Sequence, residues 1–386
     1  MFDHDVSPPS AGVAATVAAV ASSDRELTAP VDLCRPDGRL DPAAVGWSRR
    51  PLHRANLRGW GRTKRWEYWC VTAPTHLVAL TVSDLDFLAL NSVYVLRWDD
   101  PDDPDDPTDP ADPTGVRELE RTALVPFGRG VALPQTIAGS DGTGTNVAVG
   151  PERPTGGRVR VEIRGEAGGT RLRARCVTPD GRPVEVDVFA ALPEGHETLS
   201  VVVPWDERRF QYTSKHTARP ARGTLRIGDE VLSFGGPGKD EAWAVLDHGR
   251  GRWPRSVHWN WGAASGRTDG RTVGLQFGGR WTVGTGTTEN AVCVDGRLTR
   301  ISEELAWSYD LADPLAPWTV RTPGSDLLDL VFTPFHDRRT RTEAGLLANR
   351  TDQCFGHYDG TVRAEDGRRI AVHDLLGWAE DVRMRW

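Results

Sequence analysis

Short runs of β-branched and aromatic residues, separated by clusters of turn residues, recur along most of this 386-residue chain. Three early runs are WEYWCV (66–71), HLVALTV (76–82) and NSVYVLR (91–97). Residues of these types fit the pleated surface of a sheet, and each run has the length of a strand. The three-to-four-residue periodicity of helices is weak throughout. The sequence therefore predicts an all-β protein.

Alternation within the runs indicates antiparallel strands with one buried face. Between residues 158 and 176, six arginines alternate with apolar residues such as Val161, Ile163 and Leu172. Alternate residues of a strand point to opposite sides of a sheet, so we interpret the arginines as a solvated face.

Later runs continue the pattern, with Gly-Asp, Asp-Gly and Gly-Gly pairs that suit hairpin turns. Examples are 223–228, 230–235 and 272–279, and RWTVG (280–284) is also predicted to be extended. The last segment, 373–386, is predicted to form either a helical turn or a final strand.

The length exceeds that of one ordinary β-domain, so two domains are expected. We place an N-terminal β-barrel-like domain at 26–205 and a C-terminal one at 206–386, after a flexible tail at 1–25. Residues 99–115 repeat Pro and Asp, which forbids regular structure because Pro lacks the N–H and like charges repel. This segment is predicted to be an exposed loop.

Charge and cysteine content narrow the class of protein. The formal net charge of −7 argues against a nucleic-acid-binding protein. The three lysines, Lys64, Lys215 and Lys239, stand against 44 arginines, which we interpret as compositional bias. The five cysteines form no C-x-x-C pair, which fits a reducing compartment. No apolar run approaches the ~18 residues of a membrane span, and the start lacks a basic signal-peptide segment, so we predict a cytoplasmic protein without stable membrane insertion.

Tryptophan is frequent, with 15 residues, and a third of them fall in one window. These are Trp243, Trp253, Trp259, Trp261 and Trp281. Indole rings are large and apolar, and each N–H needs a partner when it is buried. The window is therefore either an aromatic core or the wall of a ligand pocket.

Polar residues share this window. Asp247 and Arg250 lie in a Gly-rich stretch. If VHWNW (257–261) is extended, His258 and Asn260 face one side and its two tryptophans face the other. The alternatives are a pocket with a few convergent polar groups, and a buried network in which Asp247 pairs with an arginine.

Other candidates have simple structural alternatives. Glu289 and Asn290 follow a Gly/Thr-rich stretch and fit a turn, and Glu67 lies between aromatic residues on a strand where it can face solvent. The sequence has no G-x-S-x-G, H-E-x-x-H, Walker or Rossmann motif, and its histidines lack metal-ligand spacing. We therefore predict no cofactor and no metal.

Four segments carry a family resemblance: 49–90, LDHGRGRWPRSVHWNWGAASG (246–266), TTENAV (287–292) and the ending from Phe355. Together they make the chain similar to the bacterial family called domain of unknown function 2804. The resemblance covers about residues 26–386 and is interrupted by the acidic segment. The family name carries no activity.

More remotely, the chain is similar to paired lipocalin-like barrels, a group that includes carotenoid hydratases, tocopherol cyclase and Diels–Alder cyclases of polyketide pathways. This resemblance implies two lipocalin-like antiparallel β-barrel halves packed together, with a hydrophobic substrate at their junction. In the hydratases an aspartate is thought to protonate an alkene, and Asp247 is the candidate here. Such a likeness concerns the fold, and function depends on the site.

Three functions follow as hypotheses. The first is a cofactor-independent hydratase, cyclase or isomerase, including a pericyclase, that acts on a hydrophobic small molecule of isoprenoid or polyketide metabolism. The second is a lipocalin-like carrier of an apolar ligand, and the third is a carbohydrate-active protein. For the first, the predicted catalytic residues are Asp247 as acid with His258 and Asn260 to orient substrate or water. The predicted substrate-binding residues are Trp253, Trp259, Trp261, Glu289, Asn290, Arg250 and Glu67.

Overall fold

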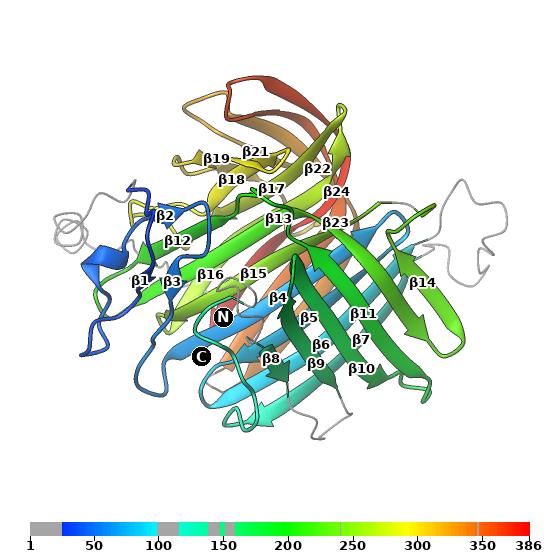
Figure 1. Cartoon of the computed structure of the whole chain (residues 1–386), viewed down its shortest axis with the longest axis horizontal. Helices are drawn as coiled ribbons and strands as arrows, with labels where there is room; N and C mark the ends of the chain where they lie inside the picture. Colours follow the sequence, from blue (N-terminus) through cyan, green and yellow to red (C-terminus); the bar gives the residue numbers. More distant parts are fainter. Residues whose placement is uncertain (1–24, 99–115, 138–146, 151–158, 240, 346) are drawn as a thin grey trace.

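The structure is a computed structural model that describes residues 25–98, 116–137, 147–150, 159–239, 241–345 and 347–386. The predicted tail, apart from Arg25, and the predicted acidic loop at 99–115 lie outside these residues. The regular structure of the described part consists of strands, in two large curled sheets (Figure 1), and one turn of 3-10 helix.

The first sheet has thirteen strands. They are β2 (Trp47–Ser48), β4 (Thr63–Ala73), β5 (His76–Asp84), β6 (Leu88–Trp98), β7 (Val116–Pro126), β8 (Val147–Gly150), β9 (Arg160–Glu166), β10 (Gly169–Val177), β11 (Pro183–Ala191), β12 (Leu199–Pro204), β13 (Phe210–Ile227), β14 (Glu230–Phe234) and β15 (Ala242–Arg252).

The second sheet has nine strands. They are β16 (Ser256–Thr268), β17 (Arg271–Gly279), β18 (Asn290–Val294), β19 (Arg297–Ile301), β20 (Ala306–Ser308), β21 (Trp318–Arg321), β22 (Leu328–Ala344), β23 (Leu347–Arg363) and β24 (Arg369–Arg385). A short parallel pair, β1 (Val31–Asp32) with β3 (His53–Arg54), and one turn of 3-10 helix, η1 (Pro42–Ala44), precede β4.

The order of strands in the first sheet places β15 and β13 between two groups that are distant in sequence. The order is β7-β6-β5-β4-β15-β13-β11-β10-β9-β8, so strand pairing connects β4–β7 to β8–β11 through these two long strands. The sheet curls around an apolar core that includes Trp69, Ile163 and Leu246. The second sheet, in the order β19-β18-β17-β16-β24-β23-β22-β21-β20, encloses a core of its own around Phe277, Trp318 and Tyr358, among other residues.

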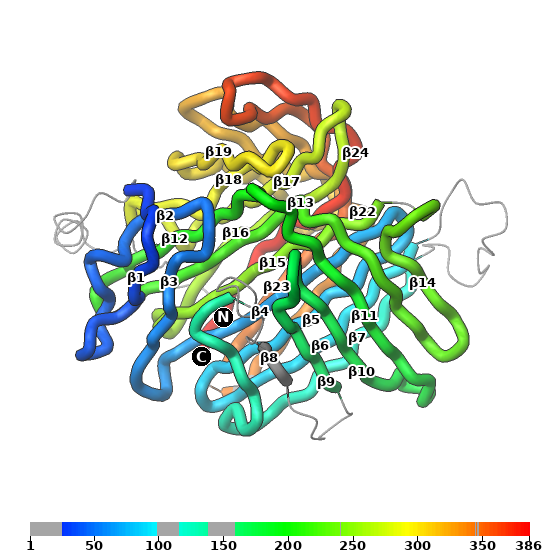
Figure 2. The backbone as a smooth tube through the Cα atoms, in the orientation of Figure 1, coloured from blue at the N-terminus to red at the C-terminus, as the bar shows by residue number. Residues whose placement is uncertain are grey.

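A third apolar cluster lies between the two sheets. It joins Cys70 and Val245 of the first sheet to Trp261, Phe355 and Trp378 of the second. In Figure 2 the orange path of β23, the strand of Phe355, runs behind the blue and cyan strands of the first sheet. Because strand side chains alternate, β4, β13 and β15 present one set of residues to the first core and the other to this junction.

The prediction of an all-β protein made of two packed, curled antiparallel sheets is confirmed. Alternation in β9 and β10 is also as predicted, since Val161, Ile163 and Leu172 are buried while Arg173 and Arg175 are exposed. The final segment is the strand β24.

Two features differ from the sequence prediction. RWTVG is a turn and not a strand, because Arg280 and Gly284 adopt positive φ angles that reverse the chain after β17. The chain passes from the first sheet to the second between β15 and β16, so the predicted border at residue 205 does not coincide with the border between the sheets.

Candidate functional site

The junction of the two sheets contains charged groups from both. On the first sheet, Lys215 of β13 and Asp247 of β15 are direct cross-strand partners, and Tyr68 of β4 continues the same row. Nζ of Lys215 lies 2.9 Å from Oδ1 of Asp247, and the Thr213 hydroxyl donates to the same oxygen at 3.3 Å. The pairing of neighbouring strands thus fixes an ion pair on the face that the second sheet covers.

A matching row crosses the second sheet. Gln353, Glu380, Trp261 and Gly278 are successive cross-strand partners on β23, β24, β16 and β17. A Cβ atom at position 278 would overlap the side chain of Glu289, so the glycine leaves the space that this glutamate fills. From there Oε2 of Glu289 lies 3.3 Å from Nζ of Lys215.

Tryptophan N–H groups hold two of the carboxyl groups. Nε1 of Trp281 donates to Oε1 of Glu289 at 2.7 Å, and Nε1 of Trp259 donates to Oε1 of Glu380 at 2.9 Å. Nε2 of Gln353 donates to the other oxygen of Glu380 at 3.1 Å. We call Lys215, Asp247, Glu289 and Glu380 the charged cluster.

The charged cluster has one ammonium group for three carboxyl groups. Burial raises the pKa of Glu380 to about 7, although the Trp259 N–H and the charge of Lys215 act against the rise. Burial also raises the pKa of Glu289, with Lys215 opposing. Burial alone would lower the pKa of Lys215, but the charges of Asp247 and Glu289 raise it above the ordinary value. The cluster therefore holds a carboxylic acid that can lose its proton near neutral pH.

Indole rings surround one side of the charged cluster. Trp253 stacks on Trp281 with ring centroids 5.8 Å apart and meets Trp259 edge-on at the same distance. Trp205 and Trp386 contact Trp253 edge-on at 5.4 and 5.7 Å. We call the group Trp66, Trp205, Trp253, Trp259, Trp281 and Trp386 the tryptophan cluster. Trp259 is half-buried, and so one of the two rings that hold a carboxyl group also reaches solvent.

His258 and Asn260 belong to a different group. Nε2 of His258 lies 2.8 Å from Oδ2 of Asp381, and the Tyr309 hydroxyl donates to the same oxygen at 2.5 Å. Asn260 donates to Tyr309 at 2.9 Å and accepts from Arg280 at 2.9 Å. The predicted alternation holds in β16, but it directs these two side chains away from the junction that contains Asp247.

Glu67 and Arg250 also lie apart from the charged cluster. Both are buried on the inner face of the first sheet, where Nη2 of Arg250 donates to Oε1 of Glu67 at 3.0 Å. His248 lies 2.7 Å from the same carboxylate oxygen. Asp247 therefore pairs with Lys215 and not with Arg250. The two residues are three positions apart on β15, so their side chains lie on opposite faces of the sheet. Asn290 is the first residue of β18, where it accepts from the Gly278 N–H and donates to the Glu303 carbonyl, a structural role.

The structure thus unites part of the predicted site. Asp247, Glu289, Trp259 and Trp261 meet at the junction, and Trp253 is next to them in the tryptophan cluster. The other predicted site residues lie outside the charged cluster and the tryptophan cluster: Glu67, Arg250, His258, Asn260 and Asn290.

Sequence reasoning missed Lys215 and Glu380. Lys215 had a signal: in a chain with three lysines and 44 arginines, each lysine is a marked choice. A compact ammonium group can contact two carboxylates and the Trp261 ring, 4.6 Å away, where a planar guanidinium needs more room. Glu380 had no local signal, because its partners come from β16 and β23.

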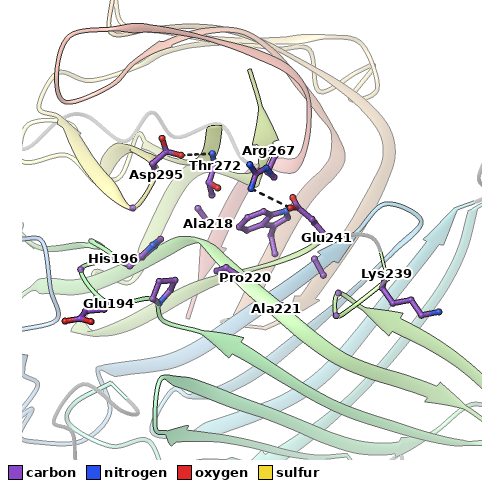
Figure 3. Close-up of a pocket in the computed structure, with 17 residues that line it drawn as sticks. Glu194, His196, Ala218, Pro220, Ala221, Lys239, Glu241, Arg267, Thr272 and Asp295 are labelled. Carbon is purple, nitrogen blue, oxygen red and sulfur yellow. Dashed lines mark hydrogen bonds and ion pairs between the residues drawn. The ribbon is translucent and has the colours of Figure 1, made fainter. Parts of the chain in front are cut away.

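Cavities lie at other places in the junction and in the first sheet. One of about 550 Å³ lies between β13, β15 and the β16–β17 turn, with an apolar wall of Pro220, Ala221 and Trp243. Figure 3 shows its charged rim, where Arg267 lies 3.7 Å from Glu241. Another, of about 650 Å³, opens at one end of the first sheet. Neither is lined by a predicted site residue, so a ligand pocket at the tryptophan cluster stays a prediction.

The described residues show neither a metal centre nor a membrane-spanning helix. In that part of the chain, no group of three or more His, Cys, Asp and Glu residues is placed to hold a metal ion. No helix there is long and apolar enough to cross a membrane. All five cysteines are buried and free.

Comparison with known families confirms the sequence resemblance. The model of the family described as a domain of unknown function (DUF2804) matches residues 24–386. The chain belongs to this family. No curated protein matches the DUF2804 chain by sequence.

Solved structures give distant matches. The crystal structure of kievitone hydratase from Nectria haematococca is 10% identical, over 84% of this chain and 89% of that chain, with a TM-score of 0.37. The crystal structure of CghA with Sch210972 is 11% identical, over 86% and 89%, with a TM-score of 0.24. Similarity this low carries no argument about the activity of the DUF2804 chain.

Proposed function

We propose that this DUF2804 protein is an enzyme that protonates a largely apolar small molecule at the junction of its two sheets, with Glu380 as the general acid. The observation that carries the proposal is the buried charged cluster, with one ammonium and three carboxyl groups, beside the tryptophan cluster. The reaction class is that of a hydratase, cyclase or isomerase. The expected substrate is an unsaturated isoprenoid- or polyketide-like compound.

Glu380 is the preferred acid because its environment differs from that of the other two carboxyl groups. Asp247 and Glu289 both contact the ammonium of Lys215. Glu380 receives hydrogen bonds only from the neutral groups of Trp259 and Gln353, among the described residues. A general acid works best when its pKa is near the working pH, and burial gives Glu380 that property.

The chemistry needs no oxidant or reductant. The Glu380 proton forms a new C–H bond with the electron pair of a double bond, which leaves a carbocation and the Glu380 carboxylate. Water then adds and returns its proton to Glu380 in a hydration. Attack by a second double bond and loss of a proton gives a ring, and direct loss of a neighbouring proton gives an isomer.

The surrounding residues suit a cationic intermediate. An indole face stabilises a desolvated cation by about 1–2 kcal/mol, and Trp259 lies next to the acid. Asp247 and Glu289 offset the positive charge of Lys215, which would otherwise oppose the carbocation.

The main alternative is a carrier that binds an apolar ligand and releases it unchanged. The tryptophan cluster supports this function as well as it supports an enzyme. The geometry gives no support to a carbohydrate-active protein. Asp247 and Glu289, a carboxylate pair that such a reaction would use, both contact the ammonium of Lys215.

The first test compares protein isolated from its native cells with three variants by mass spectrometry of organic extracts. Glu380→Gln removes the proposed acid, Asp247→Asn removes the acid suggested by the family resemblance, and Glu185→Gln changes an exposed carboxylate of β11 as the matched control. We expect wild type and the control to hold a product, and Glu380→Gln to hold a precursor that is its isomer or differs by one water.

A second measurement identifies the step. When the precursor is turned over in D₂O, the proposal expects one deuterium on a product carbon with wild type and none of this product with Glu380→Gln. If all four proteins hold the same compound and none changes it, the carrier function replaces the enzyme. If Asp247→Asn alone accumulates the precursor, the acid is Asp247.

A further inference from the structure

The cavity of about 650 Å³ at the end of the first sheet contains a charge that the charged cluster does not involve. Arg219 of β13 lines this cavity, and its side chain is almost completely buried. No carboxylate among the described residues lies within ion-pair distance of its guanidinium group. Burying an isolated charge is unfavourable by several kcal/mol unless an opposite charge or a full set of hydrogen bonds compensates it.

A bulge in β13 explains why the arginine is inside. The register with β15 shifts between His216 and Arg219, and Ala218 has a φ of +54°. The extra residue lets both His216 and Arg219 face the inner side of the sheet, where strict alternation would direct one of them outward. Bulges of this kind reorient side chains near functional sites.

Neutral groups fix the guanidinium without balancing its charge. Nε donates to the Ala191 carbonyl at 2.8 Å, and Nη2 donates to the Ala190 carbonyl at 2.6 Å and to the Thr170 hydroxyl at 3.3 Å. The group lies over the ring of Trp69, 4.9 Å from its centroid. Nη1 carries two N–H bonds. Its one hydrogen-bond partner among the described residues is Nδ1 of His216, at 3.4 Å.

The rest of the cavity shows what kind of ligand fits. The half-buried Arg49 at its rim is paired, since it contacts Glu26 at 3.2 Å and Glu197 at 2.8 Å. Arg50 and Glu194 are exposed to solvent. Burial and the charge of Arg219 keep the pKa of His216 well below its ordinary value, so the imidazole beside Arg219 is neutral. Part of the lining is apolar: Leu27, Pro51, Leu52, Ile137, Leu192 and Pro193. A buried positive charge without a carboxylate partner, beside an apolar part of the cavity wall, suits a single negative charge on an apolar body.

We propose that this cavity binds an apolar monocarboxylate, whose carboxylate accepts a hydrogen bond from Nη1 of Arg219. The site is separate from the proposed catalytic one, because Lys215 and Arg219 face opposite sides of the first sheet. A hydrogen bond to a charged group changes affinity by about 10- to 100-fold. The cavity volume lies within the range of small-molecule sites.

The test uses octanoate and octanamide, which share a shape and differ in charge, with binding measured by isothermal titration calorimetry on the full chain. Wild type is expected to bind octanoate at least 10-fold more tightly than octanamide. Arg219→Met is expected to lose this preference, and Arg50→Met, at the exposed rim of the same cavity, is expected to keep it.

A second variant keeps the test valid if Arg219→Met does not fold. Leu192→Trp places a larger side chain at an exposed position of the cavity lining and leaves Arg219 unchanged, and it is expected to abolish octanoate binding. Glu380→Gln is expected to bind octanoate like wild type, so the result is independent of the proposed catalytic function. Equal binding of acid and amide, no binding of octanoate at millimolar concentration, or an unchanged preference in Arg219→Met would each overturn the proposal.

Discussion

At the scale of single residues, Lys215 decides whether the junction of the sheets can hold three carboxyl groups. Its ammonium contacts Asp247 and Glu289 directly and lies over the Trp261 ring. Each carboxyl group that enters a buried site loses hydration, and a nearby opposite charge is the main compensation. Glu380 lacks such a direct contact among the described residues, and burial raises its pKa to about 7.

Replacing Lys215 by Met should therefore destabilise the protein strongly. Removing one partner of a buried ion pair lowers the free energy of unfolding by about 3–5 kcal/mol. This decrease in the free energy of unfolding should be smaller at pH 5, where the carboxyl groups can take up protons. Urea unfolding followed by tryptophan fluorescence at pH 5 and 8 measures both effects. Lys239→Met, at an exposed lysine, is the control, and equal stability of Lys215→Met and wild type would contradict the charge balance.

Glu380 should impose a pH dependence on stability. The ordinary pKa of a glutamate, 4.5, applies to the unfolded chain, and burial raises it to about 7 in the folded protein. Between these values the folded state keeps a proton that the unfolded state has lost. The contribution of Glu380 to stability should thus be complete below pH 4.5, fall by about 3 kcal/mol as pH rises to 7, and stay level above it.

Glu380→Gln should remove this contribution. The difference in unfolding free energy between wild type and variant, measured at several pH values from 4.5 to 8, should change by about that amount. The variant loses one hydrogen-bond acceptor, so the slope and not the absolute stability is the readout. Glu185→Gln should give a flat difference curve, and a flat curve for Glu380→Gln would show that its pKa is ordinary in the folded protein.

At the scale of strands, the charged cluster depends on a position without a side chain. Gly278 of β17 lies in the row with Trp261 and Glu380, and Glu289 lies over it. Any larger residue at 278 overlaps the middle of the Glu289 side chain and not merely its flexible end. The reach of Glu289 to Lys215 thus depends on a glycine on a neighbouring strand.

Gly278→Ala should destabilise the protein by about 1–3 kcal/mol, the usual effect of overpacking a filled site. Glu289→Ala removes the overlapping group, so the double variant should be less unstable than the sum of the single variants predicts. A double-mutant cycle from urea unfolding measures this coupling. Additive effects would mean that the two positions do not share the space.

The same scale shows what the sequence can and cannot predict. The alternation of apolar and polar residues predicted strands such as β4, β5, β9 and β10, because this pattern is contained in the sequence of each strand. It also separated His258 from Trp259 correctly. It gave no information about which strand lies beside which, so Asp247 could not be matched with Lys215, or Trp261 with Glu380. Those contacts depend on long-range pairing, which no local pattern encodes.

At the scale of the whole molecule, the two sheets are not two halves of the sequence. The strands β13 and β15 follow residue 205, yet they hold β4–β7 and β9–β11 together in the first sheet. They also carry Lys215 and Asp247 to the face that the second sheet covers. The position of these strands therefore links the assembly of the first sheet to the formation of the charged cluster.

This arrangement predicts how the chain can be divided. Pieces 25–254 and 255–386 each keep a complete sheet, and each exposes the apolar face that includes Val245 or Trp378. When co-expressed, they should bind each other and co-purify through a tag on one piece. Pieces divided at 205/206 should not co-purify, because the first piece would lack β13 and β15, the two strands that connect its strands β4–β7 to β8–β11. Near-UV circular dichroism of the recovered complex checks that the tryptophans regain their native packing. Equal recovery from both divisions would mean that the first sheet does not need β13 and β15 in the same piece, and the link between its assembly and the charged cluster would be lost.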